Sequence, residues 1–192
     1  MVELIKKKTT LAADFAEASA DYRSNPQLKL QSNCYSYALG IAEFGFGVPG
    51  TLKDSARMGF ALKNITPSYI FNALMKDGLE PVRETELDEY GDRPIIACFI
   101  AYQNDYHFYL RHKDNFWSHQ RGKGGEVSNE DNRGMLIVNP QNAWRGKYKE
   151  FVGYFALPSE GVAITEKKNW SAESLVIANA ELKNQANKKL EV

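Results

Sequence analysis

The sequence predicts an α+β protein in which N-terminal helices pack on an antiparallel sheet. In the first half, apolar residues recur at helical spacing, most clearly over 67–77, with Thr66-Pro67 as a typical helix start and Gly78 as a typical stop. From Pro94 onward the spacing becomes that of short strands that follow one another closely. Helices followed by a run of adjacent strands are typical of α+β proteins with antiparallel sheets.

The size and composition are those of one soluble domain with an appendage. The chain has 192 residues, of which 43% are hydrophobic and 25% are charged. Lysine plus arginine equals aspartate plus glutamate at 24 each, so no net charge favours nucleic acid or an anionic membrane. No stretch is long enough to span a membrane, and residues 1–10 lack the apolar run of a secretory signal. We therefore expect a cytoplasmic protein, or one exported without a classical signal peptide.

Four further segments precede or flank the clear helix of the first half. They are a helix over 9–20 with Thr9 or Thr10 as cap, a polar loop over 21–32, a helix from Cys34 to about Gly45, and a short helix within 53–63. Glycines and a proline between residues 45 and 50 are expected to end the helix that begins at Cys34.

The second half is predicted to be mainly strand. Dense apolar and aromatic residues predict strands over 94–102, 105–111, 115–119, 135–138 and 151–157. After residue 160 the composition shifts toward Ala, Asn, Lys and Glu, which predicts a last helix over 171–189. We therefore expect one domain over 1–160 and a helical appendage over 161–192.

Cys34 lies where a helix is expected to begin. Ser32 or Asn33 can cap that helix, because both side chains accept hydrogen bonds from free amides of the first turn. The free N–H groups and the helix dipole at this end favour a thiolate, which is a nucleophile. The other cysteine, Cys98, lies within an apolar strand and is expected in the core. Two such cysteines do not make a disulfide scaffold, and we expect both thiols to be reduced.

The three histidines all fall within one predicted hairpin. A tight turn at Lys113-Asp114 places His119 as a direct or diagonal neighbour of His107 on the same face. Such neighbours lie about 5 to 8 Å apart, close enough for one imidazole to orient the other. His112 lies near the turn, and we expect it in solvent.

Together, a cysteine, a histidine base and a group that orients the histidine form a thiol–imidazole site. Cys34 is the candidate nucleophile and His107 the candidate base. The orienting group is either His119 or Asn139, which follows a later strand. A zinc site formed by Cys34, His107 and His119 is an alternative, although no Cys-x-x-Cys or His-Glu-x-x-His pattern is present. We expect no cofactor and no metal.

These residues resemble the papain-like fold, and within it the NlpC-type cysteine peptidases and amidases. In that family the cysteine follows an acidic or polar residue at a helix start, as in Asn33-Cys34. The family's base is a histidine on a later strand, which matches His107. Its third polar residue, often histidine, lies 12 residues further on, which matches His119.

The resemblance covers residues 22–158 and extends to Tyr22, since a tyrosine about a dozen residues before the cysteine often lines that family's site. The usual Asp-Cys-Ser-Gly is replaced here by Asn33-Cys34-Tyr35-Ser36, which indicates a divergent branch.

The resemblance implies a hydrolase that cleaves an amide bond in a peptide, in peptidoglycan or in a protein. A bacterial effector or toxin, with an inhibitor or immunity protein as partner, is consistent with it. Deamidation or acyl transfer on a protein glutamine uses the same residues and remains an alternative. So does a catalytically silent binding domain, which would use the aromatic side chains of the sheet.

Overall fold

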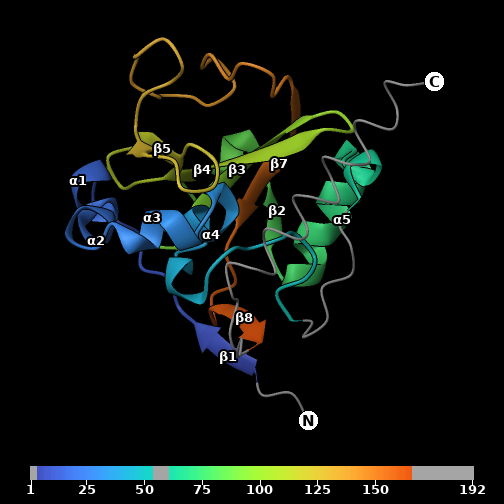
Figure 1. The fold of residues 1–192 in the computed structure, drawn as a ribbon, viewed down its shortest axis with the longest axis horizontal. Helices are drawn as coiled ribbons and strands as arrows, with labels where there is room; N and C mark the ends of the chain where they lie inside the picture. Colours follow the sequence, from blue (N-terminus) through green and yellow to red (C-terminus); the bar gives the residue numbers. More distant parts are fainter. Residues whose placement is uncertain (1–3, 54–60, 166–192) are drawn as a thin grey trace.

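The computed structural model describes residues 4–53 and 61–165. Within these ranges the protein is α+β, as predicted, with a six-stranded antiparallel sheet of order β2-β7-β3-β4-β5-β6 (Figure 1). The strands are β2 (Glu80–Val82), β3 (Ile95–Ala101), β4 (Asp105–Arg111), β5 (Trp117–Gln120), β6 (Val127–Ser128) and β7 (Glu150–Ala156). A separate pair joins β1 (Leu4–Lys7) to β8 (Val162–Thr165). The helix expected over 171–189 lies outside the described residues.

The helices are short. They are α1 (Phe15–Ala18), α2 (Ala20–Ser24), α3 (Gln27–Gln31), α4 (Cys34–Ala38) and α5 (Pro67–Asp77), with 3-10 turns η1 (Ala42–Phe44), η2 (Leu62–Asn64) and η3 (Glu84–Glu86). The start and end of α5 are as predicted, with Thr66 capping Tyr69 N–H and Gly78 left-handed at φ 95°. No helix in the described ranges has the length and apolar character needed to cross a membrane.

Several expected boundaries in the first half are wrong. The helix predicted over 9–20 begins only at Phe15, where Asp14 is the cap, because the Thr9 hydroxyl instead donates to Leu39 O at 2.5 Å. The region 21–32 contains α2 and α3 instead of a loop. The helix that begins at Cys34 ends at Ala38, far short of Gly45. The short helix expected within 53–63 falls partly outside the described residues.

In the second half, the strand expected over 135–138 is absent. A single bridge joins Glu130 to Leu136 there, and the segment otherwise forms loop. The strands at 95–101, 105–111, 117–120 and 150–156 match their predicted positions closely.

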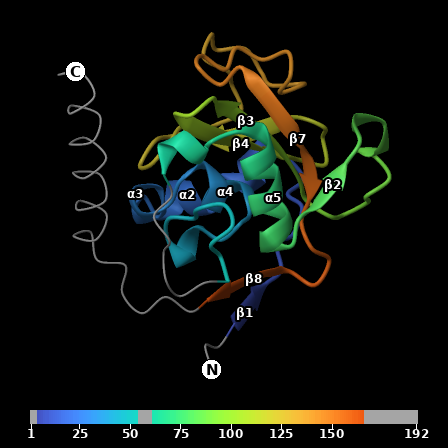
Figure 2. The ribbon, with the colours of Figure 1, turned by 90° about the vertical axis from the view of Figure 1, so that its right-hand side faces the viewer.

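Two apolar clusters lie on opposite faces of the sheet. The larger one joins the helices to the sheet and includes Tyr35 of α4, Leu74 of α5 and Phe108 of β4. The smaller one lies beneath the long connection from β6 to β7 and includes Phe99 and Tyr109. Figure 2 shows α5 beside β7, with the β6–β7 connection at the top of the molecule. Because side chains alternate along β4, Phe108 faces the helices while its neighbour His107 faces the other way, next to the β6–β7 connection.

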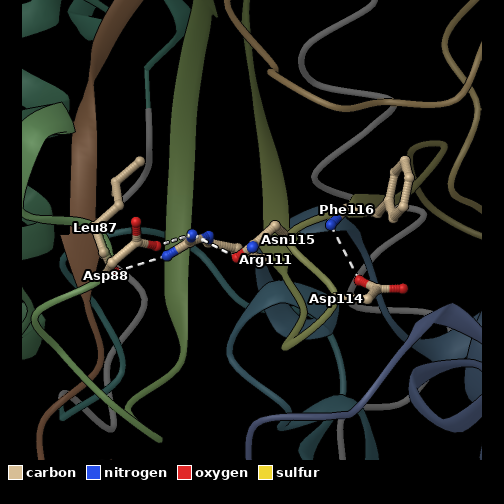
Figure 3. Close-up of polar contacts among 6 residues, drawn as sticks. All are labelled: Leu87, Asp88, Arg111, Asp114, Asn115 and Phe116. Carbon is tan, nitrogen blue, oxygen red and sulfur yellow. Dashed lines mark hydrogen bonds and ion pairs between the residues drawn. The ribbon is translucent and has the colours of Figure 1, made fainter.

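The turn between β4 and β5 sets the register of the hairpin that carries the histidines. The guanidinium of Arg111 donates to Leu87 O and to the side chains of Asp88 and Asn115 (Figure 3). Asn115 adopts φ 68°, a left-handed conformation that asparagine tolerates. Leu110 consequently pairs with Ser118 and Arg111 with Trp117.

Candidate active site

Cys34 is the first residue of α4, and Asn33 is the cap. The Asn33 side-chain oxygen accepts from Ser36 N–H at 3.0 Å and from the Ser36 hydroxyl at 2.9 Å. Its amide donates to Gly47 O at 2.8 Å. Ser32, the other candidate cap, instead bonds to Gln120 Oε1 at 2.9 Å. The helix start is therefore the one that the sequence predicts, and it is buried.

The sulfur of Cys34 packs against the backbone on either side of His107. It donates toward Tyr106 O, 3.9 Å away, and the backbone N–H of Phe108 also bonds to it. Cys34 is only 4% exposed, and burial raises the pKa of its thiol to about 12. The resting group is therefore a thiol instead of the expected thiolate, because loss of hydration outweighs the favourable helix start.

The hairpin brings His107 and His119 together as diagonal neighbours. His107 Nε2 lies 2.6 Å from His119 Nδ1, and His119 Nε2 lies 3.1 Å from the carbonyl oxygen of Glu130. A carbonyl can only accept, so His119 carries its proton on Nε2 and presents an unprotonated Nδ1. His107 must then donate from its own Nε2, which leaves its Nδ1 with a free lone pair. Nδ1 of His107 is buried and has no hydrogen-bond partner among the described residues.

Aromatic packing holds the two imidazoles in place. Tyr148 stacks on His107 with centroids 4.9 Å apart, and Tyr109 stacks on His119 at the same distance. Burial is the main reason that the pKa of His107 lies well below its ordinary value, with the positive charges of nearby groups adding to it. Burial likewise lowers the pKa of His119 to about 4. Both rings are therefore neutral at pH 7, as the tautomer assignment requires.

Asn139, the other candidate for orienting His107, lies elsewhere. Its amide donates to Glu84 Oε1 at 3.1 Å, and its oxygen accepts from Gln141 N–H at 2.8 Å. No hydrogen bond joins it to either histidine of the pair in the described part of the chain. Of the two candidates, only His119 contacts His107.

Tyr22 is buried in the larger apolar cluster, which also contains Cys34. Its ring packs edge-on against Tyr37 with centroids 5.3 Å apart, and burial raises the pKa of its hydroxyl. It does not line the cavity beside the histidine pair.

His112 is not in solvent, contrary to expectation. It is 1% exposed, and its Nε2 lies 2.7 Å from the hydroxyl of Ser118, which in turn lies 2.6 Å from the hydroxyl of Tyr37. The turn that carries it is covered by the N-terminal segment, since Lys113 N–H donates to Ala12 O at 3.0 Å. A residue in a turn stays exposed only if no other segment of the chain packs on the turn. The sequence of the hairpin alone does not show whether one does.

A cavity of about 210 Å³ lies beside the histidine pair. Its lining residues come from β4, β5 and the two loops that follow β5: His107, Tyr109, His119, Arg121, Gly122, Asn132, Arg145 and Tyr148. The sequence reasoning missed Arg121, Arg145 and Tyr148. Arg121 could have been found, because it follows His119 by two residues; the other two belong to a distant loop with no local pattern that marks them.

No three histidine, cysteine, aspartate or glutamate side chains within residues 4–53 and 61–165 gather so as to hold a metal ion.

Comparison with known proteins finds a similar protein. The chain is 31% identical over 130 residues to insoluble matrix shell protein 1 of Ruditapes philippinarum, and the match covers 68% of this chain and 82% of that protein. No family model and no solved structure matches the chain.

Proposed function

We propose that this chain, which belongs to the family of insoluble matrix shell protein 1, is a cysteine hydrolase that cleaves an amide bond. One observation carries the proposal: the hydrogen-bond chain from Glu130 O through His119 to His107 leaves a free lone pair on His107 Nδ1. A neutral imidazole with a fixed tautomer and a free lone pair can act as a general base. The thiol of Cys34 lies against the backbone of the same strand, within two residues of that base.

In the proposed reaction, His107 Nδ1 takes the proton from Cys34 Sγ as the sulfur attacks the amide carbonyl. The imidazolium then gives this proton to the leaving amine, and the C–N bond breaks to leave a thioester on Cys34. His107 next takes a proton from water, and the hydroxide formed attacks the thioester. The C–S bond breaks, His107 returns its proton to the sulfur, and the thiol is regenerated with release of the carboxylic acid.

A neutral resting pair fits this route better than a preformed ion pair. Burial opposes charge on both Cys34 and His107, so the proton transfer belongs to the step in which the sulfur attacks. No hydrogen bond joins Sγ to Nδ1 in this structure. Catalytic hydrogen bonds of this kind are often long before substrate binds and tighten in the complex.

The papain-like, NlpC-type arrangement is part of the same proposal. A helix that begins at Cys34 packs on the sheet, while a strand histidine and a second histidine 12 residues later complete the site. Peptides, peptidoglycan stem peptides and proteins are the proposed substrates, with deamidation or acyl transfer as the related alternative. We propose a cytoplasmic location or export without a classical signal peptide, and an inhibitor or immunity protein as a partner.

A second candidate is a catalytically silent structural domain. Two observations favour it: Cys34 is a buried thiol, and the relative's name describes a component of an insoluble shell matrix. That role would place the chain outside the cell.

Site-selective alkylation distinguishes the two candidates. Wild type and His107→Ala are treated with iodoacetamide, and mass spectrometry follows labelling of each cysteine. Cys98, which is fully buried in β3, is the internal reference. In the proposed enzyme, His107 takes the proton as the sulfur attacks the reagent, so Cys34 should be labelled at least about tenfold faster than Cys98, and His107→Ala should remove most of that difference. If Cys34 and Cys98 are labelled at equal rates in wild type and in His107→Ala, the chain belongs to the catalytically silent class.

Turnover is the second readout. Cleavage of a mixed peptide and muropeptide substrate pool should be lost in Cys34→Ala and should persist in Cys98→Ala. Equal cleavage by Cys34→Ala and wild type would refute the mechanism.

A further inference from the structure

The cavity beside the histidine pair is lined by two guanidinium groups that have no carboxylate partner within residues 4–53 and 61–165. Arg121 projects from the end of β5 and Arg145 from the β6–β7 connection. Elsewhere in the described ranges, Arg83, Arg93 and Arg111 each pair with a carboxylate, whereas Arg23 donates to neutral oxygens and Arg133 packs on the Trp144 ring. No pair with a carboxylate involves Arg121 or Arg145 among the described residues.

Arg145 is a partly buried cation whose hydrogen-bond partners in the described part of the chain are all neutral. Its Nε donates to Tyr148 O at 3.3 Å, and Nη1 donates to Ala143 O at 2.9 Å and to Pro140 O. Its guanidinium carbon lies 4.3 Å from the centroid of the Phe99 ring. Burial lowers its pKa, which reflects the cost of holding a charge where water is scarce. An anion that entered the cavity would offset this cost.

The hydrogen-bond partners of Arg121 that the structure describes are likewise neutral oxygens. One terminal nitrogen, Nη2, lies 3.4 Å from the Ser128 hydroxyl and 3.2 Å from both Glu130 O and Asp131 O. These contacts fix the guanidinium at the cavity wall. None of them neutralises its charge.

Two carboxylates in the segments that carry the lining residues, Asp131 and Asp105, already have other partners. Asp131 accepts from the backbone N–H groups of Arg133, Met135 and Trp144 at 2.8 to 3.1 Å. Asp105 accepts from the Tyr148 hydroxyl at 2.8 Å and pairs with Lys147. The residues that line the cavity include Arg121 and Arg145 and no acidic side chain, so the lining carries a net positive charge even with His107 and His119 neutral.

We propose that this cavity binds a carboxylate through Arg121 and Arg145. The role of this site in catalysis rests on the proposed hydrolase function. Substrates of that hydrolase would carry a free carboxylate close to the amide that is cleaved. The cavity volume of about 210 Å³ suits a small anionic group instead of a bulky one. Guanidinium groups bind carboxylates by charge-assisted, often bidentate hydrogen bonds, so an uncharged amide of the same shape should bind much more weakly.

Binding can be measured without turnover. The probes are N-acetylalanine, which has a carboxylate, and N-acetylalaninamide, which is its uncharged counterpart. The protein is full-length Cys34→Ala, so no cleavage interferes. Calorimetry gives the affinities, and the imidazole NMR resonances of His107 and His119 locate the site. N-acetylalanine should bind and shift these resonances, and N-acetylalaninamide should bind at least about tenfold more weakly.

Arginine variants made in the same background test the two side chains. Arg121→Gln and Arg145→Gln should each weaken N-acetylalanine binding about tenfold or more, while Arg83→Gln, an exposed arginine away from the cavity, should leave it unchanged. Arg145 also holds its loop together, so Arg145→Gln can fail to fold. Arg121 is exposed, and its variant keeps the test decisive.

Equal binding of the two probes, or binding unaffected by Arg121→Gln, would overturn the carboxylate site. This outcome is distinct from failure of the proposed function. If wild type cleaves peptides with and without a nearby carboxylate equally well, the hydrolase stands and the carboxylate site falls. If N-acetylalanine binds as expected but Cys34 is inert, the site stands as a binding site and the hydrolase falls.

Discussion

Asp77 is a buried carboxylate at the end of α5, and it should give the protein an unusual dependence of stability on pH. It is 1% exposed and accepts from the Tyr35 hydroxyl at 2.8 Å, from Gly50 N–H at 2.6 Å and from Leu52 N–H at 3.1 Å. It thereby ties α5 to α4 and to the loop over 47–52. All three contacts favour the ionised form, yet burial dominates and raises its pKa from the ordinary 3.8 to about 6.

The size and sign of the effect follow from that difference. Each pKa unit between the folded and unfolded states is worth about 1.4 kcal/mol, so the interval from 3.8 to about 6 corresponds to roughly 3 kcal/mol. The folded state binds the proton more tightly than the unfolded state. The contribution of protonated Asp77 to the free energy of unfolding is therefore fully present below pH 3.8 and is lost as the pH rises through about 6. A loss of this size is a large fraction of the stability of an ordinary domain.

The test compares wild type with Asp77→Asn, whose side chain does not titrate. Urea unfolding at intervals between pH 4 and pH 7 gives the free energy of unfolding of each protein. The buried histidines contribute with the opposite sign, because their lowered pKa values favour folding as the pH rises. Their contribution is common to both proteins and cancels in the difference. As the pH rises from 4 to 7, the free energy of unfolding of wild type minus that of Asp77→Asn should fall by up to about 3 kcal/mol, with most of the fall below pH 6.

Tyr35→Phe provides a matched control. It removes one donor to the carboxylate, so the pKa of Asp77 should rise further and the fall should move to higher pH. A difference between wild type and Asp77→Asn that stays flat to within 0.5 kcal/mol, roughly the error of such measurements, would refute the reasoning.

Three further predictions concern the site and its support. His119→Ala should reduce kcat far more than Asn139→Ala, since His119 and not Asn139 is hydrogen-bonded to His107, the proposed base; the opposite order in two equally stable variants would transfer the orienting role to Asn139. Asn33→Ala should lower the free energy of unfolding by about 2 to 4 kcal/mol in urea melts, because it removes the cap and leaves Gly47 O unpaired; a loss under about 1 kcal/mol would contradict this. Tyr22→Phe should leave kcat unchanged, because Tyr22 is buried in the larger apolar cluster and does not line the cavity; a lower kcat with unchanged substrate binding would instead assign its hydroxyl to the oxyanion.

The sequence by itself determined the features that depend on neighbours in the chain. The cap and proline at the start of α5 and the alternation along β4 act within a few residues, so their outcomes follow from local pattern. The contact between His107 and His119 belongs to the same class, because a tight turn and a two-residue period leave little choice of register.

Boundaries that depend on remote partners were not readable in this way. Thr9 does not cap a helix because its hydroxyl donates to Leu39, 30 residues away. His112 is buried because the segment around Ala12 lies over its turn. In both positions a long-range contact overrides a local preference.

The electrostatic state of the candidate site was decided by the tertiary structure alone. A helix start favours a thiolate at Cys34, but the sheet packed against it removes water and keeps the proton on sulfur. Arg145 reaches the cavity from a loop whose course depends on contacts spread over the β6–β7 connection. The residue types and their order along the chain are local information. Loss of hydration, and the approach of charged groups from distant parts of the sequence, occur only when the chain folds. These two effects determine which groups are charged and which ligand the cavity favours.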